Sequence, residues 1–195
     1  LLYHVERMNE ESANALLKVM EEPPEGVLFL LTADSLASVL PTIRSRCVSF
    51  AVAPVSPADC TRYCAAQGVD KKTAALYSEL FDGHIGTVLA VARDEARAAQ
   101  VEKALELARA AAARDSYTAA VLLAAYEKDK AAAAALLTDF RAVAAAGLRS
   151  SPHAPVQGTQ ARQAVRLADA ALQRLGAQVN PKVVLTVFAA KLRTV

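Results

Sequence analysis

The feature that most constrains the fold is the helical periodicity that runs from Ser56 to the end of the sequence. Apolar residues recur there at three- and four-residue steps, and the interruptions are Gly, Pro and Asn. Hydrophobic residues make up 54% of the 195 residues and aromatic residues only 5%, because the excess is alanine. Alanine favours helix and buries little area per residue. This pattern predicts a mainly α protein packed through small side chains.

The first of these helices has a clear start, since Ser56, Pro57 and Asp59 supply a cap, a first-turn proline and an early acid. The tract Ala131–Ala135 continues at helical spacing into Leu136, which predicts a packed helix rather than a linker. The expected helices are Pro57–Gln67, Lys71–Phe81, Ile85–Arg93, Asp94–Arg114, Ser116–Asp129, Lys130–Leu148, Gly158–Leu175 and Pro181–Leu192.

The first fifty residues have a different pattern. Asn9 is a good N-cap for an amphipathic helix that reaches Met20. Leu1–Val5 is typical of the end of a strand, and Val27–Leu31 and Val48–Val52 are unbroken apolar runs of strand length. Such runs suit a parallel sheet covered by helices. We therefore expect a short parallel sheet with a helix.

The net charge and the cysteine positions argue against a nucleic-acid-binding surface, a disulfide and a zinc site. The net charge of +2 argues against a dedicated nucleic-acid-binding surface. Cys60 and Cys64 lie one helical turn apart, where a disulfide would be strained, so free thiols in a reducing compartment are expected. A zinc site from Cys47, Cys60, Cys64 and His84 is disfavoured because no CxxC pair is present. We expect no metal in this chain.

The sequence shows no secretory signal and no apolar run that we expect to cross a bilayer, which predicts a cytoplasmic protein without membrane contact. Its first residue, Leu1, is not methionine and lies within the strand-like run. We therefore expect a fragment that lacks an N-terminal part.

Four short motifs carry a family resemblance. Read in order, Asn14–Lys18 (NALLK), Glu21–Pro24 (EEPP), Phe29–Thr32 (FLLT) and Pro41–Cys47 (PTIRSRC) resemble the clamp-loader subunits of bacterial DNA polymerase III, members of the AAA+ superfamily. Each motif alone is weak, but the ordered run is specific. The later helices resemble the family more by pattern than by identity.

The resemblance implies three domains. Residues 1–53 would be the C-terminal part of an AAA+ α/β core, 54–93 a helical lid, and 94–195 an all-α collar for oligomerisation. Most of the N-terminal ATPase core, with any GxxxxGK[ST] phosphate loop, would precede residue 1.

In that family a Ser-Arg-Cys motif carries an arginine finger, which reaches the terminal phosphate of a neighbouring subunit's ATP. The resemblance makes Arg46 the finger and Ser45 and Cys47 its motif neighbours. A guanidinium is permanently charged and can bind phosphate oxygens with two parallel donors. Without the motif, Arg46 would be interpreted as a solvated loop residue. For Arg44 we expect a surface or sheet-end ion pair.

Thr32 lies near the family's polar sensor position, although Ala33 competes for that alignment. A hydroxyl satisfied by the local backbone is the alternative interpretation.

Two positions bear on the type of subunit. Tyr3 and His4 fall where ATP-hydrolysing relatives have the Asp and Glu that organise magnesium and activate water, and neither residue suits those roles. Gly86 falls where those relatives have a nucleotide-sensing arginine. The chain therefore most resembles a delta-prime subunit, which holds no cofactor of its own while ATP and Mg²⁺ bind in the neighbouring subunit.

The resemblance implies a non-catalytic subunit of the DNA polymerase III holoenzyme, a DNA-directed DNA polymerase (a nucleotidyltransferase) of the nucleoid-associated replisome. Its partners would be gamma/tau and delta subunits in a ring, the sliding clamp, and primed DNA through the complex. Two alternatives stay open: an active gamma/tau-type clamp-loader ATPase, and a stand-alone helical interaction protein.

Overall fold

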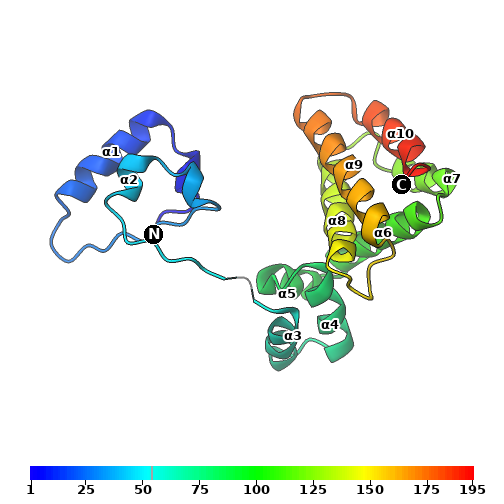
Figure 1. Cartoon of the computed structure of the whole chain (residues 1–195), viewed down its shortest axis with the longest axis horizontal. Coiled ribbons are helices and arrows are strands. Elements are labelled where there is room, and N and C mark those ends of the chain that lie inside the picture. Colours follow the sequence, from blue (N-terminus) through cyan, green and yellow to red (C-terminus); the bar gives the residue numbers. More distant parts are fainter. Residues whose placement is uncertain (54) are drawn as a thin grey trace. The chain divides into compact units, whose positions relative to one another are not determined.

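The computed structural model describes residues 1–53 and 55–195, and it divides the chain into two compact units (Figure 1). The first unit is Leu1–Ala53, and the second comprises the remainder to Val195. Pro54, which opens the predicted lid, lies outside the described residues. Each unit has its own hydrophobic core.

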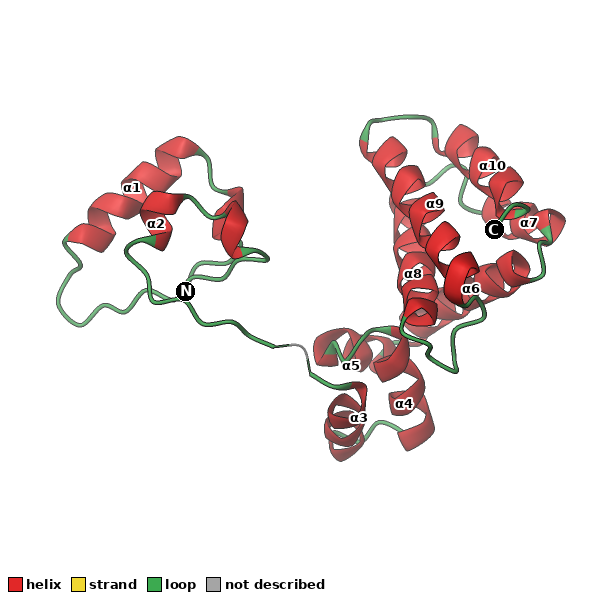
Figure 2. Cartoon of the chain, in the orientation of Figure 1, coloured by secondary structure: helices red, strands yellow, loops and turns green. Residues whose placement is uncertain are grey.

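Helices form nearly all of the regular structure in both described ranges (Figure 2), so the predicted mainly α fold is confirmed. The first unit holds α1 (Glu10–Glu21) and the short α2 (Pro41–Arg44), with 3-10 turns at Val5–Arg7 and Leu36–Ser38. The helices of the second unit are α3 (Pro57–Ala66), α4 (Lys71–Leu80), α5 (Ile85–Arg93), α6 (Glu95–Ala112), α7 (Ser116–Ala124), α8 (Lys130–Leu148), α9 (Gly158–Gly176) and α10 (Pro181–Leu192).

The residues that the structure describes do not show the predicted parallel sheet. Val27–Leu31 and Val48–Val52 form no strand, and their side chains are not buried on two faces. Leu28 is 78% exposed and Phe50 is 85% exposed. A buried parallel strand needs a hydrogen-bonded neighbour and a covered face. The first unit supplies neither along most of these two runs.

The run Leu1–Val5 lies beside the run that ends at Leu31, with one parallel bridge between Leu2 and Leu31 and further hydrogen bonds to Thr32. The Leu2 amide donates to the Leu30 carbonyl at 2.8 Å, and the Thr32 amide donates to the Leu2 carbonyl at 2.9 Å. This short contact replaces the expected sheet. It places the residues after Leu2 beside those that follow Leu31.

The core of the first unit forms between α1 and α2. Asn9 caps α1 as predicted, since its side chain accepts a hydrogen bond from the Ser12 amide at 2.8 Å. The amphipathic stripe of α1 then packs against α2. The buried members are Val5, Ala13, Leu16, Val39 and Ile43.

In the second unit, α3, α4 and α5 pack together. Ser56 caps α3 as predicted and accepts from the Asp59 amide at 3.1 Å. Arg149, just after α8, connects this group to the longer helices. Its guanidinium donates to the Glu79 carbonyl at 3.2 Å and pairs with Asp82 at 3.1 Å.

Helices α6 to α10 form a bundle in which α8 packs along α9 and also contacts α6 (Figure 1). Buried alanines on α8 and α9 allow the helices to approach closely, as the composition predicts. The largest buried side chains in this bundle are Phe140 and Phe188, whose rings meet edge to face with centroids 5.3 Å apart.

Helix α8 bears on the expectation that no apolar run of this sequence is long enough to cross a bilayer. Over 18 residues it has a mean hydropathy of 1.4, so by length and composition alone it could cross a membrane. Half of that window is buried inside the second unit, and α8 packs against α6 and α9. These are the surroundings of a core helix.

A buried charge lies at the contact between α6 and α8. Asp139 is 3% exposed, and its two carboxylate oxygens accept from the two terminal nitrogens of Arg97. Gln100 donates a further hydrogen bond at 2.8 Å. Hydrogen bonding to Asp139 raises the pKa of Arg97 above its ordinary value. The Arg97 guanidinium therefore stays charged at neutral pH.

Replacing Asp139 with Asn should destabilise the second unit by about 2–4 kcal/mol, because Arg97 loses its buried counter-charge. The matched control is Asp169→Asn, which breaks a pair with Arg141 whose side chains are both about half exposed. That change should cost under about 1 kcal/mol. Urea unfolding measures both free energies, and equal losses would contradict this account.

Candidate functional site

The predicted finger lies on a short turn, Pro41–Cys47, which we call the Arg46 turn. Pro41 occupies the first turn of α2, where its fixed backbone angle favours a helix start. Ile43 is 1% exposed and anchors the turn in the first core. The Arg46 amide donates to the Ile43 carbonyl at 3.1 Å. One side of the turn is therefore buried and the other faces solvent.

Arg46 extends along the surface and is held by three acceptors. Its Nη2 donates to Glu21 at the end of α1, and its Nη1 donates to the Thr42 carbonyl at 3.1 Å and to Ser45 Oγ at 3.4 Å. The side chain of Arg46 is 38% exposed and that of Glu21 is 52% exposed. The guanidinium is oriented but accessible from solvent.

The neighbours of Arg46 have local roles. Ser45 Oγ donates to the Thr42 carbonyl at 3.0 Å. Cys47 is half-buried and packs against the first core. Arg44 is exposed and forms no ion pair with the residues that the structure describes, so the pair expected there is not formed.

The sequence alone does not identify Glu21 as the partner of Arg46. The two residues are 25 positions apart, and only the packing of α2 on α1 brings them together. Both residues lie in motifs that the sequence identifies: Glu21 is the first residue of EEPP, and Arg46 is the second arginine of PTIRSRC. Nothing in the spacing shows that these two motifs meet.

Tyr3, Thr32 and Gly86 are the positions that the family resemblance relates to a nucleotide site. Tyr3 is 68% exposed. The hydroxyl of Thr32 accepts a hydrogen bond from the His4 backbone amide at 3.3 Å. A Cβ added at Gly86 in α5 would meet no atom within 4 Å. Packing therefore does not require a glycine at that position.

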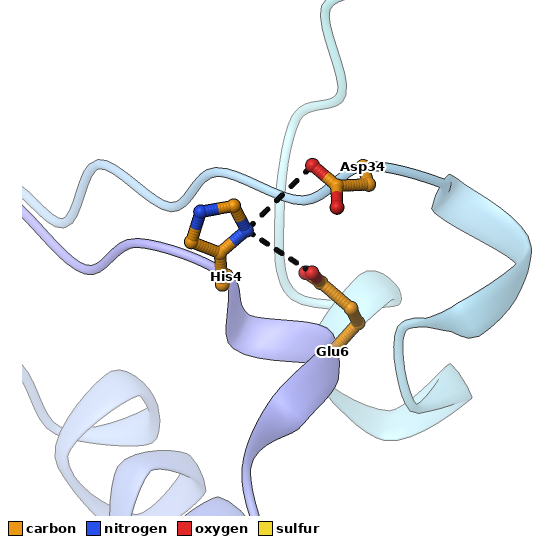
Figure 3. Close-up of side chains that lie close together, drawn as sticks. All are labelled: His4, Glu6 and Asp34. Carbon is orange, nitrogen blue, oxygen red and sulfur yellow. Dashed lines mark hydrogen bonds and ion pairs between the residues drawn. The ribbon is translucent and has the colours of Figure 1, made fainter. Parts of the chain in front are cut away.

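A second polar group lies in the same unit (Figure 3). His4 Nδ1 is 3.3 Å from Glu6 Oε1 and 3.6 Å from Asp34 Oδ1. The nearby backbone amide of Glu6 lowers the pKa of its carboxyl group below the ordinary value. His4 and Arg7 act in the same direction, and burial opposes them. Glu6 is therefore ionised at neutral pH. No metal-ligand spacing connects His4, Glu6 and Asp34 in the sequence, so this group could not be predicted from it.

The cysteines agree with the sequence prediction of free thiols. Cys60 and Cys64 are fully buried on α3, with their sulfur atoms 4.0 Å apart. Burial, and then the neighbouring Cys60, raise the pKa of Cys64 to about 11. Among the described residues, the one group of three potential metal ligands contains no cysteine.

The motif-bearing segment matches a known family. Residues 1–56 match a family model described as DNA polymerase III, delta subunit. The chain is 45% identical to the delta-prime subunit of DNA polymerase III from Yersinia pestis over 62 residues, which is 32% of this chain and 18% of that protein. It is 62% identical to the delta-prime subunit from Haemophilus influenzae over 42 residues, 22% of this chain and 13% of that protein.

The segment is also similar to another subunit type. It is 46% identical to the tau subunit of DNA polymerase III from Escherichia coli over 50 residues, 26% of this chain and 8% of that protein. The chain thus spans less than a fifth of the length of each of these curated relatives. The resemblance of residues 1–56 to delta-prime-type clamp-loader subunits is confirmed.

The raised pKa of Cys64 predicts a loss of stability at high pH. A folded-state pKa above the unfolded value stabilises the protein below about pH 9, and this contribution is lost as the pH rises through about 11. Between these limits we expect the wild type to lose about 2 kcal/mol more than Cys64→Ala does. Urea unfolding of both proteins at the two pH values measures the difference. Identical pH dependence would contradict the assignment.

Proposed function

We propose that this chain is a delta-prime-like subunit that lends Arg46 to a neighbouring ATPase subunit. The similarity of residues 1–56 to delta-prime-type clamp-loader subunits supports this proposal. The observation that carries the proposal is the position of Arg46. The guanidinium lies on a surface turn anchored by buried Ile43, and its partners there are exposed or belong to the turn itself.

The chemistry of this role is electrostatic. ATP and Mg²⁺ would bind in the neighbouring subunit, and Arg46 would approach the terminal phosphate from outside that pocket. Transfer of a phosphoryl group spreads negative charge over its oxygens, and a fixed guanidinium stabilises that charge. The Ile43 anchor and the Thr42 carbonyl reduce the freedom that Arg46 would lose on docking.

The proposal that this chain turns over no ATP rests on three positions. Tyr3 and His4 replace the acids of an ATPase, and Gly86 leaves open space where a side chain would fit. The similarity to tau and gamma subunits keeps the gamma/tau-type ATPase as the second candidate. An intact phosphate loop followed by Asp-Glu in sequence upstream of Leu1 would favour that candidate.

We assign the helices of the second unit to a lid and an oligomerisation collar. Exposed apolar side chains on α7 and α10 support a role in assembly; they are Tyr117, Val121, Val183 and Val187. The partners would be gamma/tau and delta subunits, and through the ring the sliding clamp and primed DNA, in the cytoplasmic replisome. A pull-down from the native organism that recovers no clamp-loader subunit would favour a stand-alone interaction protein.

Replacing Arg46 with Ala in a reconstituted clamp loader should slow ATP hydrolysis at one site by about 10³-fold or more, because the transferring phosphate loses its positive partner. Ring assembly should be unchanged, since the side chain is exposed. Arg44→Ala on the same turn is the matched control and should leave turnover unchanged. Single-turnover hydrolysis measures the effect, and wild-type rates with Arg46→Ala would reject the proposal.

We further propose that Glu21 competes with the phosphate for Arg46. Both groups are anionic oxygen acceptors for the same guanidinium, and exposed ion pairs are worth about 0.2–1 kcal/mol. Glu21→Gln should therefore lower the ATP concentration for half-maximal turnover by about two- to fivefold. Glu22→Gln is the neighbouring control. An increase in that concentration would instead show that Glu21 positions Arg46 for its target.

A further inference from the structure

Three potential metal ligands from two separate segments converge in the first unit. His4 precedes the 3-10 turn Val5–Arg7, Glu6 lies within that turn, and Asp34 follows the run that ends at Thr32 (Figure 3). One ligand atom from each of His4, Glu6 and Asp34 lies within 4.8 Å of the others. The group combines an imidazole nitrogen with two carboxylates.

The distances fit a small divalent cation. Zinc binds nitrogen and oxygen ligands at about 2.0–2.2 Å, so neighbouring ligands of a tetrahedral ion lie about 3.3–3.6 Å apart. His4 Nδ1 is 3.3 Å from Glu6 Oε1 and 3.6 Å from Asp34 Oδ1. The side chain of Asp34 is 69% exposed and is free to close the remaining pair.

An unsatisfied oxygen is the second observation that points to a ligand. The side chain of Glu6 is only 10% exposed, and its carboxylate is directed at His4 and Asp34 (Figure 3). Within the described part of the chain, Glu6 Oε2 is buried and has no hydrogen-bond partner. Leaving a buried carboxylate oxygen unpaired is costly. A cation bound between the three side chains would compensate that charge.

The backbone holds the two segments in register. The Val5 amide donates to the Thr32 carbonyl at 3.0 Å, and the His4 amide donates to the Thr32 hydroxyl at 3.3 Å. Val5 itself is buried in the first core. The distance between the His4–Glu6 turn and Asp34 is therefore set by hydrogen bonds and packing, not by the ligands alone.

Arg7 is the one competitor for this charge in the immediate surroundings that the structure describes. Its guanidinium lies 3.8 Å from Glu6 Oε1 and 3.9 Å from Asp34 Oδ2, and its side chain is 71% exposed. Both distances are near the limit of an ion pair, and exposed pairs of this kind contribute little. A divalent ion can displace such a contact.

We propose that His4, Glu6 and Asp34 bind one divalent cation of the zinc type. Nδ1 of a neutral His4 ring donates its lone pair to the metal while Nε2 carries the proton. Asp34 supplies one oxygen, and the Glu6 carboxylate binds the ion through both oxygens, so that Oε2 gains a partner. Three protein ligands leave a fourth position for water. The proposal depends on the geometry of the first unit and is independent of the role of Arg46.

Isothermal titration of the full chain with zinc chloride tests the site. We expect about one ion per chain, with affinity reduced at least about tenfold in His4→Gln and in Asp34→Asn, since each variant removes a ligand. Asp34 is exposed, so its variant is expected to fold. Arg7→Gln should strengthen binding by about two- to fivefold, because it removes the competing charge. The His4 Nδ1 resonance should shift on zinc addition in nitrogen NMR spectra.

Two controls separate this site from other zinc ligands in the chain. Cys47→Ser and His153→Ala should each leave the titration unchanged. Binding that survives His4→Gln and Asp34→Asn, or is abolished by Cys47→Ser, would overturn the proposal. The absence of saturable binding at millimolar zinc would overturn it as well. Circular dichroism of each variant shows whether a loss of binding reflects a loss of fold.

Discussion

The packing of Ile43 against α1 is the contact on which the functional interpretation depends. The α2 turn has only four helical residues, too few to hold a fixed position by itself. Burial of Ile43 beside Ala13 and Leu16 supplies that position. The same contact brings Arg46 to Glu21. Packing of α2 on α1 therefore forms both the hydrophobic core of the first unit and the ion pair on its surface.

Most helices of the second unit could be predicted because residues directly next to each helix determine where it begins. Ser56 and Asn180 cap helices whose next residue is proline, and Asp94, Asp115 and Asp129 cap three others through their own side chains. Where a cap and a period of apolar residues coincide, the predicted and observed ends agree closely, as at Lys130–Leu148. Propensity, capping and burial favour the same structure in this region.

The first unit was less predictable because its structure depends on distant partners. Val27–Leu31 and Val48–Val52 are apolar enough for strands, but a parallel strand forms only beside another. Most apolar side chains of the two runs are exposed where the sequence predicted burial on both faces, although Phe29 and Leu31 pack against the first core. The short helix α2 and the two 3-10 turns have no periodic signal long enough to detect. The proposed roles of the three domains stay a prediction.

In the candidate site, too, local features could be predicted from the sequence and long-range contacts could not. Arg46 was found from a contiguous motif, whereas its contact with Glu21 and the approach of Asp34 to His4 depend on the folded chain. Neither pair has a spacing that identifies it in the sequence. The comparisons support the clamp-loader type of residues 1–56 but match both delta-prime and tau subunits. The choice between those types therefore rests on Tyr3, His4 and Gly86.

A structure of the assembled ring with a non-hydrolysable ATP analogue would test the central claim most directly. Our account predicts that the guanidinium of Arg46 leaves Glu21 and lies within hydrogen-bonding distance, about 3 Å, of the terminal phosphate in the adjacent subunit. An Arg46 side chain that still pairs with Glu21 and faces bulk water in that ring would contradict it.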